Sequence, residues 1–198
     1  LLTPISAFIK LTKNSEYAFI LESVEGGEQY ARYSFIGRDP KQIIKSEKNK
    51  VYTKSNGDWE LVTKKFLPYV RDLHRSYQSP KIEGLPSFSG GLVGYLGYES
   101  VTWIEDIPIY KEDELDVPDA VFMLFEELIA FDHLKNQIIL FSNVQITDDI
   151  NLNSAYELAL KKIDKMGEEL HEDIDYQTPE VTRNSILESN FSQQSFEK

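Results

Sequence analysis

The glycine-rich run GGLVGYLGY at residues 90–98 is the first stretch whose composition suggests ligand binding, because backbone amides free of side chains can cradle a phosphate. It holds four glycines within eight residues. The spacing is neither G-x-G-x-x-G nor that of a P-loop, since no Gly-Lys-Ser or Gly-Lys-Thr follows. We therefore predict a core strand here, in which glycine allows a close backbone approach or a bulge.

The side chains that could catalyse a reaction are few and scattered. Glu126 and Glu127 are neighbours within an apolar run, and neighbouring side chains of a strand point to opposite faces, so the two carboxylates cannot converge on one substrate. The chain has no cysteine, and its three histidines (His74, His133 and His171) are too far apart in sequence to form a local metal-ligand pair. We predict no catalytic residue and no metal ligand in this chain.

Composition and charge are those of a globular chain. The 198 residues (22.9 kDa) are 41% hydrophobic and 12% aromatic, which favours a packed core over disorder. The net charge of −12 disfavours nucleic-acid binding; residues 1–100 carry +3 and residues 101–198 carry −15. No apolar run reaches membrane-spanning length, and the LLTP start lacks signal-peptide features, so we expect no membrane association and a cytoplasmic location. Because no initiator Met is present, we expect the chain to begin inside a longer product or to have lost its first residues.

Hydrophobic periodicity predicts the elements that position these residues. Short or alternating apolar runs predict strands, and apolar spacings of three and four residues predict helices. The strands are predicted at 17–21, 30–36, 42–46, 50–54, 90–98, 120–131 and 137–144, and the helices at 65–77 and 153–170, the second capped by Asn153. An Asn-Gly turn at 55–58 indicates a hairpin. Short connections predict an α+β fold, with antiparallel β-sheets packed as a sandwich and a few flanking helices.

Several blocks of sequence, in order along the chain, carry a resemblance to a known family. They are TPISAF at 3–8, ILESVEGGE at 20–28 with ARYSFIG at 31–37, GGLVGYLGYE at 90–99, and VPDAVFM at 117–123 running on to AFDH at 130–133. Together they resemble the amino-terminal domain of anthranilate synthase component I, in the family of chorismate-utilising enzymes. The resemblance extends over about residues 3–196, essentially the whole chain.

The resemblance implies a function that the residues alone do not. The family converts chorismate to anthranilate and pyruvate, taking ammonia from a glutamine amidotransferase subunit. Its chorismate and magnesium ligands lie in a carboxy-terminal catalytic domain. Residues 1–175 then form a regulatory and partner-docking domain, and residues 176–198 a linker and the start of the catalytic domain. We expect a fragment of that enzyme, inactive by itself, with Mg²⁺ bound only outside this sequence.

The same resemblance implies that this domain carries most of a feedback site for L-tryptophan. The Leu-Glu-Ser motif places the site at Leu21, Glu22 and Ser23. Glu22 can pair with the ligand's ammonium group, and the Ser23 hydroxyl can donate or accept a hydrogen bond. Tyr33 can add an aromatic wall from the adjacent strand. Each also has a plainer interpretation: Glu22 as an edge-strand charge, Ser23 as part of a turn and Tyr33 as a core residue.

Two other functions stay open at this point. Aminodeoxychorismate synthase component I shares the glycine-rich and Pro-Asp blocks, although the LES and RYSFIG blocks favour the anthranilate enzyme. A free-standing amino-acid-binding module is the other alternative. For the amidotransferase partner, the acidic stretch from Glu105 to Asp119 is a candidate contact, because charge density in a long loop attracts a complementary surface.

Overall fold

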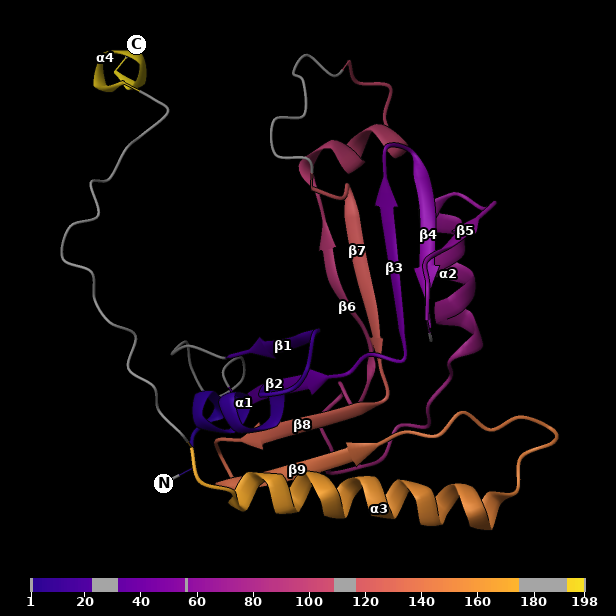
Figure 1. Cartoon of the computed structure of the whole chain (residues 1–198), viewed down its shortest axis with the longest axis vertical. Coiled ribbons are helices and arrows are strands. Elements are labelled where there is room, and N and C mark those ends of the chain that lie inside the picture. The colour runs from indigo at the N-terminus through magenta and orange to yellow at the C-terminus, as the bar shows by residue number, and fades with distance from the viewer. Residues whose placement is uncertain (1, 23–31, 56, 109–116, 175–191, 198) are drawn as a thin grey trace.

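The computed structural model describes residues 2–22, 32–55, 57–108, 117–174 and 192–197, and Figure 1 shows how they are arranged. The strands are β1 Ala18–Leu21, β2 Tyr33–Arg38, β3 Gln42–Glu47, β4 Lys50–Lys54, β5 Glu60–Val62, β6 Gly91–Leu96, β7 Ala120–Phe125, β8 Glu127–Asp132 and β9 Gln137–Ser142. The helices are α1 Pro4–Thr12, α2 Phe66–Ser76, α3 Leu152–His171 and α4 Gln193–Phe196, with a 3₁₀-helix η1 at Tyr98–Trp103. No helix in the described part of the chain combines the length and apolar composition needed to cross a membrane.

The strands form two antiparallel sheets that pack in layers with the helices. The four-stranded sheet has the order β1-β2-β8-β9, and the five-stranded sheet has the order β5-β4-β3-β7-β6. In Figure 1 the strands of one sheet run across those of the other, with α3 along the four-stranded sheet and α2 beside the five-stranded sheet. Apolar clusters fill the space under α1 and α3, the space between the sheets and the space under α2. The predicted fold class is therefore confirmed.

Both faces of the four-stranded sheet are covered, so successive side chains of its central strands enter different clusters. On β8, Ile129 and Phe131 face α1 and α3, whereas Leu128 and Ala130 face the second sheet. All four are at most 6% exposed. A strand that is buried on both faces needs a continuous apolar run rather than an alternating one, and residues 128–131 provide it.

The single strand predicted at 120–131 is wrong, because the chain changes sheet at Glu126. β7 pairs with β3 in one sheet and β8 pairs with β2 in the other. The corner is held by Asn143, whose backbone N–H and side-chain amide both donate to the Glu126 carbonyl, at 2.8 and 2.9 Å. The apolar pattern continues on both sides of the corner, so periodicity alone could not locate it.

Two helix predictions also need correction. Residues 4–12 form α1, which the sequence analysis did not predict; its signal was Thr3, whose hydroxyl forms a reciprocal capping box with Ser6, followed by Pro4 at the first helical position. The cap of α3 is Asn151 rather than Asn153, since its side chain accepts from the Ser154 N–H at 3.0 Å. The helix predicted at 65–77 is confirmed as α2, and the 50–54 strand pairs with β5 across the predicted turn.

Glycine permits close contacts at two strand positions. Gly37 lies inside β2 beside Phe19, and a Cβ at this position would overlap the Phe19 ring. Gly94 lies in β6, where a Cβ would overlap the Val121 carbonyl oxygen and come within 2.7 Å of the Phe122 Cα. The glycine-rich run therefore contains a strand, as predicted, but not a core strand, because β6 lies at the edge of the five-stranded sheet and none of its residues is buried. Gly94 allows β6 to approach β7.

We expect Gly94→Ala to destabilise the protein by about 1–3 kcal/mol, because the clashing atoms are backbone and cannot rotate away. Gly167→Ala is the matched control, since its Cβ would meet only Leu140, at 4.0 Å, and Ala improves a helix interior by up to about 1 kcal/mol. Urea denaturation of both variants measures the difference. Equal stabilities would contradict the assigned role of Gly94.

Candidate functional site

Two of the residues predicted to bind a ligand, Leu21 and Glu22, lie where β1 forms an edge of the four-stranded sheet. Leu21 ends β1, pairs with Phe35 of β2 and is 48% exposed. Glu22 follows and is exposed, and no cation of the described residues forms an ion pair with it. Ser23 lies outside the described residues. The edge thus carries an apolar residue and an acidic residue at consecutive positions of the chain.

The strand register brings Tyr33 onto the same face as Leu21. Because Leu21 pairs with Phe35, Tyr33 is its diagonal neighbour, a position typically ~7–8 Å away and within reach of an aromatic side chain. The Tyr33 ring centroid lies 5.9 Å from that of Phe35, which in turn packs edge-on against Phe88 at 5.2 Å. Tyr33 is half-buried, so its ring belongs to the packing between the sheets and still has surface open to a ligand.

An ion pair closes the end of the β2–β8 ladder. Arg32 donates through Nε and Nη2 to the two carboxylate oxygens of Asp132, at 3.0 and 2.7 Å, and its guanidinium lies 4.8 Å from the Tyr33 ring centroid. The hydrogen bond with Arg32 is the main cause that lowers the pKa of Asp132 to about 2; burial opposes this, and backbone N–H groups of Leu134 and Lys135 add to it. The Asp132 side chain is 0% exposed, so the pair is a fixed anchor.

A serine and a histidine meet beside this ion pair. The Ser34 hydroxyl and His133 Nε2 are 2.8 Å apart, a geometry that elsewhere can activate a nucleophile. Ser34 is 0% exposed, however, and the neighbouring carboxylate of Asp132 is engaged by Arg32. The contact therefore links β2 to the start of the β8–β9 turn and is not a catalytic pair.

Sequence reasoning missed this cluster. It treated His133 as a lone residue and gave no role to Arg32 or Asp132, which are separated by 100 positions. The available signal was that Arg32 lies in the ARYSFIG block and Asp132 in the AFDH block, two of the blocks that carried the resemblance. Such a signal marks both residues but does not indicate that they touch.

The remaining predicted groups are separated or lie outside the described residues. Glu126 pairs with Lys41, whereas Glu127 pairs with Lys162 at 2.8 Å, so the two neighbouring carboxylates have different partners. Residues 109–116 of the acidic stretch lie outside the described residues, and Asp119 accepts a 3.4 Å hydrogen bond from Ser46. Within the described ranges no three His, Asp or Glu side chains are grouped to hold a metal ion, and we assign no Mg²⁺ ligand to them.

Comparison with known proteins identifies the class to which this fold belongs. The family model of chorismate binding enzymes matches residues 16–198. The chain therefore belongs to the chorismate-binding enzyme family. A solved structure, anthranilate synthase component I from Streptococcus pneumoniae TIGR4, matches with a TM-score of 0.61 and 25% identity over 88% of this chain and 36% of that one.

Curated relatives carry the same protein name as that structure. Anthranilate synthase component 1 of Acetivibrio thermocellus is 36% identical over 85% of this chain and 34% of its own length. The probable anthranilate synthase component 1 of Schizosaccharomyces pombe is 37% identical over 86% of this chain and 32% of its own length. Anthranilate synthase component 1 of Synechocystis is 33% identical over 83% of this chain and 33% of its own length. The chain spans about a third of the length of these relatives.

We expect Asp132→Asn to lower stability by up to about 2 kcal/mol near neutral pH, because it removes a carboxylate whose pKa is held near 2. A lowered pKa stabilises the fold above the unfolded-state pKa of about 4, and this contribution is lost as pH falls toward 2. The two proteins should therefore converge in stability between pH 4 and 2. Denaturation at several pH values measures this, and a constant difference would contradict the assigned role.

Proposed function

We propose that this chain is the amino-terminal, regulatory part of an anthranilate synthase component I. The observation that carries the proposal is that the relatives named above are anthranilate synthase components matched over more than four-fifths of this chain. The reaction is the conversion of chorismate to anthranilate and pyruvate, with ammonia from a glutamine amidotransferase subunit, in the cytoplasm. Chorismate and Mg²⁺ would be bound by residues outside this sequence.

The proposal includes a feedback site for L-tryptophan at the β1 edge. A free amino acid offers an ammonium group, a carboxylate and, in tryptophan, an indole ring. The exposed Glu22 carboxylate suits the ammonium group, and Leu21 and the half-buried Tyr33 offer apolar surface on one face. Ser23 would add a hydrogen bond. Support comes from this combination of charge and apolar surface at a sheet edge.

The deciding experiment assays the whole enzyme that contains this sequence with chorismate, Mg²⁺ and ammonia. Anthranilate as the product supports the proposal. Aminodeoxychorismate as the product would replace it with the folate-pathway alternative, and no chorismate turnover would favour a free-standing binding module. Adding the amidotransferase subunit with glutamine in place of ammonia tests the partner.

The 198-residue chain alone is expected to form no anthranilate, with either ammonia or glutamine plus the partner. The reason is that the groups required for chorismate chemistry are expected outside it. Fluorescence detection of anthranilate provides the measurement. Magnesium-dependent product formation by the purified chain would contradict the expectation.

We expect Glu22→Gln to weaken tryptophan inhibition of the whole enzyme about ten- to a hundredfold, because a hydrogen bond to a charged group contributes about 1.5–3 kcal/mol. Glu60→Gln, on exposed β5 of the other sheet, is the matched control and should leave inhibition unchanged. Turnover without tryptophan should stay the same in both, since feedback couples two separate sites.

Ser23→Phe should weaken inhibition to a similar extent, by deleting a hydrogen-bonding group and filling space. Titrating tryptophan against each variant yields the inhibition constants. Wild-type inhibition constants would show that the motif has another role. A loss of basal turnover would assign Ser23 to the fold.

A further inference from the structure

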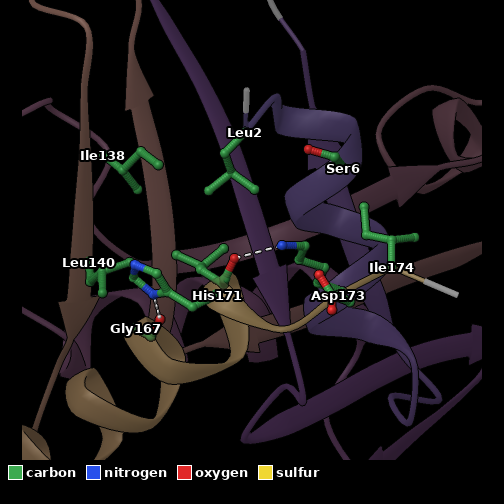
Figure 2. A pocket seen from close by; sticks show the side chains of 10 residues that line it. Leu2, Ser6, Ile138, Leu140, Gly167, His171, Asp173 and Ile174 are labelled. Atoms are coloured by element: carbon green, nitrogen blue, oxygen red, sulfur yellow. Dashed lines mark hydrogen bonds between the residues drawn. The ribbon is translucent and has the colours of Figure 1, made fainter.

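A second candidate site lies on the opposite face of the four-stranded sheet from Leu21 and Tyr33. It is a cavity of about 700 Å³ between α1, β9 and the end of α3. Figure 2 shows Leu2, Ile138 and Leu140 around it. Its volume is within the range of small-molecule sites.

The apolar part of this cavity is open because α3 has a glycine in its wall. Gly167 lies inside α3, where glycine is less favourable than alanine. A Cβ there would meet only Leu140 Cδ1, at 4.0 Å, so packing does not require the glycine. The space beside Gly167 is therefore available for an apolar group that contacts Leu2, Ile138 and Leu140.

The rim of the cavity carries a cation and an anion from different elements. Lys10 of α1 donates one hydrogen bond to the Leu170 carbonyl at 2.8 Å, which leaves two N–H donors of its ammonium group for a carboxylate. His171 Nδ1 donates to the Gly167 carbonyl at 2.7 Å, which holds its ring at the cavity wall. Asp173, which lines the cavity beyond α3, adds a carboxylate.

We propose that this cavity binds a free apolar α-amino acid as its zwitterion. The ligand carboxylate pairs with Lys10, its ammonium group pairs with Asp173, and its side chain lies against Gly167 and Leu140. A zwitterion matches both charges of the rim, whereas a simple carboxylate or amine matches only one. The site is separate from the proposed tryptophan site, because the two occupy opposite faces of the same sheet.

The test titrates the full chain with L-leucine and follows side-chain methyl NMR signals. Shifts are expected at Ile138, Leu140 and Ile174, which line the cavity. The single-charge analogues 4-methylpentanoate and isopentylamine should bind at least about tenfold more weakly. Absence of shifts at these methyls with millimolar leucine, or equal binding of the three compounds, would overturn the proposal.

Variants separate the site from general effects on the fold. Gly167→Leu should abolish leucine binding while the melting temperature is unchanged or higher, because leucine fills open space and favours the helix. Lys10→Met should weaken binding about tenfold or more, whereas Lys13→Met, at the exposed end of the same helix, should not. Glu22→Gln should leave leucine binding intact, so failure of the tryptophan site would not affect this result.

Three outcomes of the variant measurements would also overturn the inference. Undiminished leucine binding by Gly167→Leu would place the ligand elsewhere. A markedly lower melting temperature of that variant would show that the protein itself fills the space. Loss of leucine binding in Glu22→Gln would assign leucine to the tryptophan site.

Discussion

The rest of the structure depends on a two-stranded ribbon that bends once and belongs to both sheets. β2 pairs with β8 in the four-stranded sheet, and the same two chain segments continue as β3 and β7, which pair in the five-stranded sheet. At the bend, the Lys41 N–H donates to the Leu124 carbonyl at 2.8 Å, and its ammonium group pairs with Glu126. Because both sheets share this ribbon, its register sets how the sheets cross and which side chains fill the space between them.

The ribbon also sets the position of Tyr33 relative to the β1 edge. The Arg32–Asp132 ion pair lies at the end of this ribbon in the four-stranded sheet. It is next to Tyr33, which is on the same face of the sheet as Leu21 of β1. The bidentate contact orients Arg32 against the Tyr33 ring, so a charged anchor positions an aromatic surface beside the β1 edge.

The two faces of the four-stranded sheet pack against different elements. One face packs against the second sheet, and the other packs against α1 and α3. Arg38 anchors the helical face by donating to the Leu11 carbonyl at 2.6 Å and pairing with Glu169 of α3. The cavity beside Gly167 lies between these anchored helices.

The sequence by itself determined the fold class, most strands, α2 and the span of α3, because local hydrophobic periodicity records which face of an element is buried. It also placed Leu21, Glu22 and Ser23 in one motif, although Ser23 lies outside the described residues. Three features became known only from the tertiary structure. They are the corner at Glu126, where Lys41 pairs with Glu126, the Arg32–Asp132 ion pair, and the cavity beside the Lys10–Leu170 contact. Those contacts join residues 85, 100 and 160 positions apart, and no local pattern specifies which distant partner a side chain meets.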